Sequence, residues 1–107
     1  MLSTKELLVN AKNVLLESGW VQGEYGTKDG YCAVGAVDAV VEELLRNDEV
    51  TDDEAYSLYR AGENALRATL VETDRIANIV FWNDATHRTQ QDVLDLFDLA
   101  AQRAAGE

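Results

Sequence analysis

The sequence predicts an all-α fold, a compact single domain of about five helices over residues 1–107. The chain contains no proline, the residue that interrupts helices most strongly. Apolar residues recur at three- and four-residue spacing, which is the period of a helix face. Several of these stretches follow a Ser or Thr suited to capping a helix N-terminus. At 107 residues the chain can bury one hydrophobic core but not two.

The first element is expected to be a helix over residues 4–18. Ser3-Thr4-Lys5-Glu6 has the form of a capping box, in which the Ser and Glu side chains each bond the other residue's amide. Gly19 offers a stop at the C-terminal end of this helix. Residues 19–30 then hold four glycines, and they predict a loop or a small hairpin.

Two longer helices are expected next, over residues 31–46 and 52–71. The apolar residues of the first cover more than half of its circumference, which is typical of a central helix. Thr51-Asp52-Asp53-Glu54 repeats the capping-box form ahead of the second. Gly62 lies on the apolar stripe of this second helix, where a missing side chain allows a neighbouring helix to approach closely.

Two further helices are expected to complete the domain, over residues 74–82 and 90–104. Thr73 is expected to cap the shorter helix. Thr89, followed by Asp92, is expected to cap the last one. No linker, repeat or low-complexity stretch separates these elements.

The composition excludes several classes of function. The 20 acidic residues outweigh 9 basic ones, and the formal net charge of −11 works against binding to nucleic acid or to an anionic membrane surface. No apolar run approaches the roughly 18 residues that cross a bilayer. One cysteine forms no internal disulfide, and the N-terminus lacks the apolar core of a secretion signal, so we expect a cytoplasmic protein.

The acidic residues are concentrated between Asp38 and Glu54. This segment holds eight acids and only one basic residue, Arg46. Three of the acids lie in the first turn of the helix expected over 52–71. Negative charge is stabilising there because it interacts favourably with the helix dipole, so these three have a structural explanation. Four others have none, and we refer to them as the acidic edge: Glu42, Glu43, Asp48 and Glu49.

Cys32 has two interpretations. At the start of a helix a thiol can have a lowered pKa, and His87, with Asn83 and Asp84 nearby, supplies the residue types of a Cys–His–Asx nucleophilic site. Against this, the neighbours of Cys32 are mostly apolar, and free cysteine is among the most buried residue types. A buried packing role is the stronger interpretation.

A second candidate site lies in residues 81–89. Trp82 beside Asn83 and Asp84 could place an aromatic wall next to hydrogen-bonding groups, as in ligand pockets. The alternative, which we favour, places Trp82 in the core and lets Asn83 or Asp84 accept from helix-end amides. Arg88 could bond helix-end carbonyls or pair with a carboxylate.

No metal or cofactor site is expected. One Cys and one His do not make a zinc set, and the acidic stretch 48–54 lacks the calcium-loop pattern. Neither glycine-rich phosphate-binding pattern is present. Asp92, Asp95 and Asp98 follow helical spacing, but such a row is typical of a solvated face.

Two segments together resemble a known family. GWVQGEYGTKDGYCAVGAV and WND…RTQQDVL are similar to the paired motifs GWxQGxY…CAxGA and WND…RTxx[DE]VL of small uncharacterised proteins from actinobacteria and their phages. The resemblance implies no activity, cofactor or catalytic residues. It suggests one structural joint, in which the loop carrying Trp20 and Tyr25 folds over the helix after Cys32 and the WND turn locks against it. His87 lies outside the pattern, which weakens a Cys–His pair.

The leading hypothesis is a small acidic protein-interaction module without catalytic activity. The chain would be a phage-encoded or accessory protein, and its partner would be a host protein with a basic surface. A special case is an acidic mimic of nucleic acid, which the concentration of charge in one segment disfavours. The alternatives are a hydrolase or transferase using Cys32, and a small-ligand pocket lined by Trp20, Tyr25 and Trp82.

Overall fold

The computed structural model describes residues 2–104, which form five helices and one short hairpin. The hairpin strands pair antiparallel and are the only strands in this range. The expected all-α class, with a minor hairpin in the glycine-rich segment, is confirmed. In chain order the elements are α1 (Thr4–Ser18), β1 (Gly26–Thr27), β2 (Gly30–Tyr31), α2 (Ala33–Arg46), α3 (Asp52–Asp74), α4 (Ile79–Asn83) and α5 (Gln90–Ala104).

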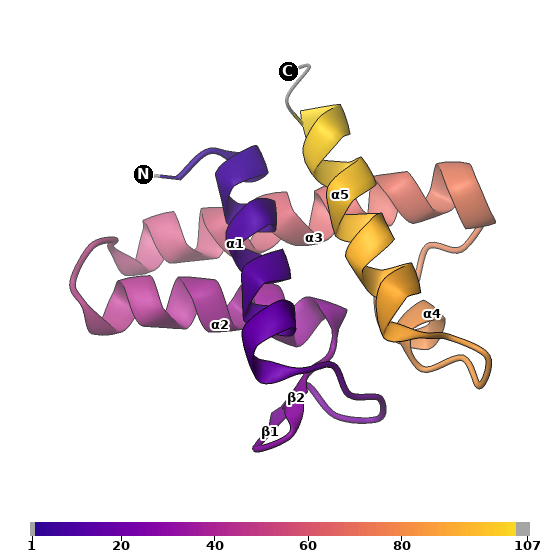
Figure 1. The fold of residues 1–107 in the computed structure, drawn as a ribbon. Helices are drawn as coiled ribbons and strands as arrows, with labels where there is room; N and C mark the ends of the chain where they lie inside the picture. The colour runs from indigo at the N-terminus through magenta and orange to yellow at the C-terminus, as the bar shows by residue number, and fades with distance from the viewer. Residues whose placement is uncertain (1, 105–107) are drawn as a thin grey trace.

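The helices form two crossed layers (Figure 1). α1 and α5 lie side by side and run in opposite directions, and together they cross the antiparallel pair of α2 and α3. Two helix layers explain the flat shape, 39 × 34 × 19 Å, because a helix with its side chains is about 10 Å thick. The hairpin and α4 gather at one end of the molecule, where α5 begins.

Local hydrogen bonds fix two of the helix starts that the sequence predicts. Ser3 with Glu6, and Thr51 with Glu54, each form a complete capping box at distances of 2.9 and 3.1 Å. At the other end of α1 the Gly19 amide donates to a carbonyl of the last turn, as expected for a helix stop.

The core lies between the two layers and receives side chains from every helix. Gly62 of α3 sits where a Cβ atom would lie 2.8 Å from Cγ1 of Val37 and 3.1 Å from Cδ2 of Leu7. Its missing side chain therefore lets α1, α2 and α3 meet closely, as the sequence suggested. No helix within residues 2–104 is both long and apolar enough to cross a membrane. The largest apolar side chains that are fully buried are Leu7, Leu8, Leu15, Leu58, Leu66, Leu70 and Phe97.

The start of α2 differs slightly from the expected boundary at residue 31. Tyr31 is not helical because it pairs with Gly26 in the hairpin. Cys32 has the extended backbone of an N-cap residue, with φ −79° and ψ 177°. The helix therefore begins at Ala33.

The predicted start of the helix over residues 74–82 is wrong. Thr73, expected to cap it, lies inside α3, where its hydroxyl donates to a carbonyl one turn earlier. α3 therefore continues beyond its expected end. The short helix α4 begins only at Ile79, where the side chain of Asn78 accepts from the Phe81 amide at 2.9 Å.

Candidate functional site

The two segments that carry the family resemblance meet where the hairpin and α4 gather (Figure 1). Residues 20–23 lie against residues 82–85, and the first turn of α2 contacts the same side chains. Hydrogen bonds between side chains and backbone connect all three segments. We refer to residues 20–23, Ala33 and residues 82–85 as the Asn83 joint.

Asn83 is the centre of this joint and is fully buried. Its Oδ1 accepts from the Trp20 indole at 2.7 Å and from the Ala33 amide at 3.0 Å. Its Nδ2 donates to the Val21 carbonyl at 3.2 Å and to Oδ1 of Asp84 at 2.9 Å. Both donors and both acceptor positions of the amide are therefore used. Asn83 does satisfy a helix-end amide, but that amide is buried and belongs to α2.

Gln22, Gly23 and Asp84 extend the joint toward solvent. Nε2 of Gln22 donates to the carbonyls of Asn83 and Ala85 at 3.0 and 2.8 Å. The Gly23 amide donates to Oδ1 of Asp84 at 3.0 Å. The Asp84 carboxylate thus accepts hydrogen bonds from residues 20–23 and from Asn83, which gives it a structural role.

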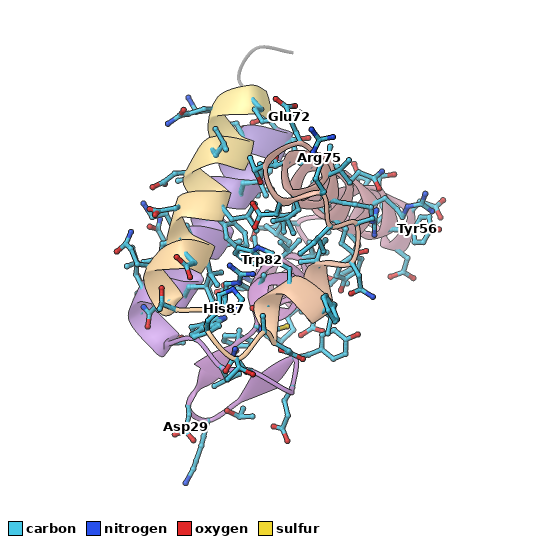
Figure 2. The ribbon with its side chains drawn as sticks, turned by 90° about the vertical axis from the view of Figure 1, so that its right-hand side faces the viewer. Asp29, Tyr56, Glu72, Arg75, Trp82 and His87 are labelled. Atoms are coloured by element: carbon cyan, nitrogen blue, oxygen red, sulfur yellow. The ribbon has the colours of Figure 1, made fainter. Side chains whose placement is uncertain are left out.

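Trp82, at one end of the joint, packs in the core. Its side chain is 3% exposed, and Figure 2 shows it in the interior of the molecule. The indole donates to Oδ2 of Asp74 at 2.7 Å. Arg88 stacks over the ring, with Cζ 4.0 Å from the centroid, and its Nε donates to the Trp82 carbonyl at 2.9 Å. Arg88 also lies 3.9 Å from a carboxylate oxygen of Asp92, so both of its expected roles are present.

Cys32 is buried, as predicted for a residue that packs in the core. It is the N-cap of α2, and its Sγ accepts from the Gly35 amide at 3.3 Å. Burial raises the pKa of the thiol, and the helix-end amides offset only part of this effect. His87 is exposed on the loop before α5 (Figure 2). The position therefore favours a neutral, capping thiol over a nucleophile.

The three aromatic residues considered for a ligand pocket do not surround one cavity. The Trp20 indole is bonded to Asn83, and Trp82 borders a pocket of about 220 Å³ between α3 and α5. Tyr25 is 61% exposed and borders other pockets, beside the hairpin and beside α4. The geometry gives no support to a shared aromatic site.

The acidic edge extends from the second half of α2 into the turn that follows it. All four of its residues are exposed, and none takes part in the three ion pairs within residues 2–104. Glu43 and Glu49 border a surface pocket of about 310 Å³, to which α1 contributes Glu17. The edge thus presents several carboxylates to solvent without a basic neighbour in that pocket.

Asp48 has a structural explanation that the sequence interpretation lacked. Its φ is 56°, in the left-handed region, and it follows the last turn of α2. Its amide donates to the Leu45 carbonyl at 3.1 Å, and the Glu49 amide donates to the Leu44 carbonyl at 2.9 Å. This is the Schellman pattern that ends many helices, and Asp tolerates the left-handed conformation better than most residues. The other three acids of the edge have no such role.

Asp38 is the residue that the sequence interpretation missed. It lies in α2, partly buried, and its Oδ1 is shielded from solvent with no hydrogen-bond partner among the described residues. Burial, followed by the nearby charges of Glu63 and Glu42, raises its pKa from 3.8 to about 6. The sequence shows Asp38 only as the first acid of a run, because its burial depends on how α3 and the hairpin pack against α2.

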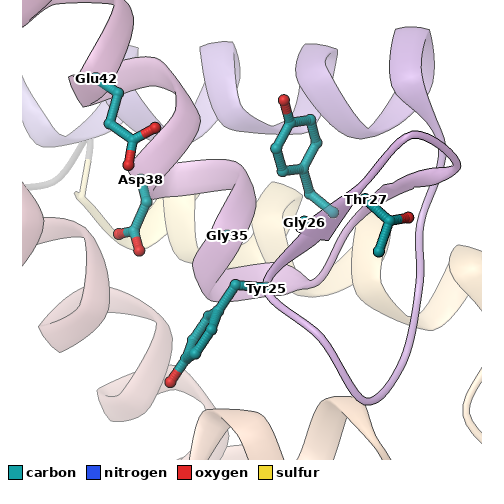
Figure 3. A pocket seen from close by; sticks show the side chains of 7 residues that line it. Tyr25, Gly26, Thr27, Gly35, Asp38 and Glu42 are labelled. Atoms are coloured by element: carbon teal, nitrogen blue, oxygen red, sulfur yellow. The ribbon is translucent and has the colours of Figure 1, made fainter.

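Asp38 borders a pocket of about 390 Å³ between the hairpin and α2 (Figure 3). This volume lies in the range of small-molecule and side-chain binding pockets. We refer to it as the Asp38 pocket. Its walls are Tyr25, residues 26–27, Tyr31, Gly35, Asp38 and Glu42.

No group of three or more potential metal-ligating side chains comes together within residues 2–104. The row of acids on α5 is used in other ways. Thr89 caps α5 as expected, and Asp92 takes part by accepting from the Thr89 amide. Asp95 accepts from a neighbouring glutamine, and Asp98 pairs with Lys12 at 2.7 Å.

Comparison with known proteins identifies a family for this chain. The model of a family of unknown function (DUF6197) matches residues 1–103, so the chain belongs to that family. No match was found among curated proteins or among solved structures. The membership agrees with the resemblance to uncharacterised proteins noted in the sequence.

Proposed function

We propose that this member of a family of unknown function is a small protein-interaction module, which binds a basic surface of another protein through its acidic edge. The observation that supports this most directly is the crowding of Glu42, Glu43 and Glu49, exposed and outside the ion pairs of the described chain. The first two lie near the C-terminal end of α2, where the helix dipole is negative. Their mutual repulsion opposes folding, so stability gives no reason for this arrangement.

Charge complementarity would act mainly on the rate of association. A net charge of −11, concentrated beside one helix end, attracts a basic surface over roughly a Debye length, about 8 Å at physiological salt. Long-range attraction of this kind speeds encounter and weakens steeply as salt is added. A salt-sensitive on-rate is therefore the signature that the proposal requires.

We place the partner among host proteins of the cytoplasm. This part of the proposal rests on the resemblance of the two paired motifs to proteins of actinobacteria and their phages. A nucleic-acid-binding protein would be one such partner with a basic surface, and its capture would indicate the mimic described above.

The test compares two variants that remove the same charge from different places. Glu43→Gln with Glu49→Gln removes two exposed acids of the edge and leaves the Schellman residue in place. Glu24→Gln with Asp29→Asn removes two exposed acids from the hairpin region as the matched control. Partners are captured from lysate at low and high salt, and association rates are then measured with the purified partner.

We expect the edge variant to associate about tenfold more slowly and to lose much of its salt dependence. The hairpin variant should associate at nearly the original rate. Equal behaviour of the two variants would show that the edge only increases solubility, and it would contradict the proposal.

A further inference from the structure

The Asp38 carboxylate is partly buried but lacks the partners that several other aspartates of this molecule have. Asp74, Asp84 and Asp98 each accept at least one hydrogen bond, at 2.7 to 3.0 Å. No side-chain hydrogen bond or ion pair within residues 2–104 reaches Asp38, and its Oδ1 is closed off from water as well. A buried acceptor without a partner destabilises the folded state, so the fold alone does not account for this residue.

The surroundings of Asp38 concentrate negative charge. Glu42 on α2 and Glu63 on α3 both disfavour ionisation of Asp38 and raise its pKa. Burial, with Glu42 and Asp38, also raises the pKa of the Tyr59 phenol on α3. No basic residue lines the Asp38 pocket. The pocket is thus a partly closed space that would hold a positive charge more favourably than water does.

The hairpin brings the Tyr25 side chain to the same pocket. The Cys32 amide donates to the Tyr25 carbonyl at 3.1 Å, so the hairpin backbone rests on the start of α2. A Cβ atom at Gly35 would lie 1.8 Å from that carbonyl oxygen, and only glycine permits the contact. Figure 3 shows Tyr25 below Gly35 in this view and Asp38 further along α2. Tyr25 remains 61% exposed, which leaves its ring free for a ligand.

We propose that the Asp38 pocket binds the guanidinium group of an arginine side chain from the partner protein. This inference rests on the proposed function, because it names the group that a basic partner would insert. The guanidinium would give Asp38 its missing hydrogen-bond donors and would balance the charges of Glu42 and Glu63. Its flat face would stack on the Tyr25 ring, which favours arginine over lysine.

The test uses short peptides on the full-length chain, so no partner needs to be known. Acetyl-Gly-Arg-Gly-amide is titrated while backbone amide NMR shifts are recorded. The same peptide with citrulline in place of arginine keeps the shape and lacks the charge. We expect shifts at residues 25–38 with the arginine peptide, and at least tenfold weaker binding of the citrulline peptide.

Two variants of α2 localise the site. Asp38→Asn should weaken binding of the arginine peptide about tenfold, because a charge-assisted bond is lost. Glu43→Gln, which removes a charge from the same helix outside the pocket, should leave the affinity within about twofold.

The pH dependence separates binding at Asp38 from general attraction to an acidic protein. Asp38 must be ionised to bind the guanidinium, so affinity should rise as pH passes through about 6. The other titratable groups around the pocket are Glu42, Glu63, Tyr59, Tyr25 and Tyr31. The Asp38→Asn variant should lose this rise.

Equal binding of the arginine and citrulline peptides would overturn the inference, as would unchanged binding by Asp38→Asn. The edge variant of the previous section, Glu43→Gln with Glu49→Gln, keeps every residue that lines the pocket. If the chain binds the arginine peptide but its association with the partner does not depend on salt, the pocket proposal stands and the acidic-edge proposal fails. The reverse result rejects the pocket alone.

Discussion

The Asn83 joint and the Asp38 pocket both involve the first turns of α2. The polar side chain at the centre of the joint is fully hydrogen-bonded, whereas the one that borders the pocket is not. Asn83 has no exposed surface and makes four hydrogen bonds. Asp38 is partly buried, carries an ionisable group and makes none among the described residues. A neutral amide with all its positions filled stabilises a fold, whereas an unpaired carboxylate works against it.

This comparison separates the residues that stabilise the fold from those that remain available to bind a ligand. Most polar residues of the family motifs make hydrogen bonds within the joint, as Trp20, Gln22, Asn83 and Asp84 do. Arg88 bonds to the joint from outside it, at the Trp82 carbonyl. Side chains whose hydrogen bonds are all internal have little capacity left for a ligand. The acids of α2 retain that capacity because the fold provides them with no partner.

The largest expected effect is at the joint. Asn83→Ala removes four hydrogen bonds and leaves the Trp20 indole and the Ala33 amide without an acceptor in a buried place. We expect a loss of about 3–5 kcal/mol in the free energy of unfolding, measured by urea denaturation. Asn64→Ala, at an exposed asparagine bonded only to Arg67, should change this free energy by less than about 0.5 kcal/mol.

Asn83→Asp tests the contribution of the two N–H donors of Asn83. The substitution keeps the shape and the acceptors and replaces the two N–H donors with a charged oxygen that faces the Asp84 carboxylate. It should be nearly as destabilising as alanine. Stability equal to that of the original chain would mean that the hydrogen bonds of the joint contribute little.

At the Asp38 pocket the expected effect has the opposite sign. The unfolded chain ionises Asp38 near pH 4 and the folded chain only near pH 6, so the folded state is destabilised by ionisation as pH rises through this window. Partial exposure limits the effect to about 1–2 kcal/mol above pH 6. Asp38→Asn should therefore raise the melting temperature at pH 7.5 and raise it less at pH 4.5.

The control for this variant is Glu43→Gln on the exposed face of the same helix. It should shift the melting temperature only slightly, and by a similar amount at both pH values. A fall in stability for Asp38→Asn at pH 7.5 would contradict the view that this carboxylate is unpaired, and the two regions would then no longer differ.

The smallest effect is expected at Cys32, which joins the two regions at the start of α2. Cys32→Ala removes a weak N-cap and leaves a small cavity, so we expect a loss of about 1 kcal/mol. Iodoacetamide should label the native thiol slowly and the unfolded thiol quickly, as followed by mass spectrometry. Rapid labelling of the native chain near neutral pH would restore the nucleophile as a hypothesis.

Much of the fold could be predicted because its signals are local. The capping boxes at Ser3 and Thr51 need only residues within one helical turn, and both are present. The prediction at Thr73 was wrong because a local signal can have two meanings. A threonine can cap a helix start, or its hydroxyl can donate to a carbonyl one turn earlier inside a helix. The choice between these depends on where α3 stops packing against its neighbours, which no local pattern records.

The sites were harder to predict because they depend on contacts between distant residues. The resemblance suggested a joint between the Trp20 loop and the WND turn, and the hydrogen bonds of Asn83 supply its detail. The acidic run was visible in the sequence, but its members look alike there. Only the packing of the hairpin and α3 distinguishes Asp38, partly buried beside a pocket, from the exposed Glu43.

The sequence separation of the Asn83 contacts has a consequence for folding kinetics. The bonds to Trp20 and Ala33 span 63 and 50 residues, so closing the joint costs roughly 3–4 kcal/mol of chain entropy unless other contacts have already formed. The helix pair α2–α3, linked by a short turn, can form much earlier. The joint should therefore close after the folding transition state. Asn83→Ala would then accelerate unfolding while leaving the folding rate almost unchanged, which makes this one asparagine a determinant of how long the native state persists.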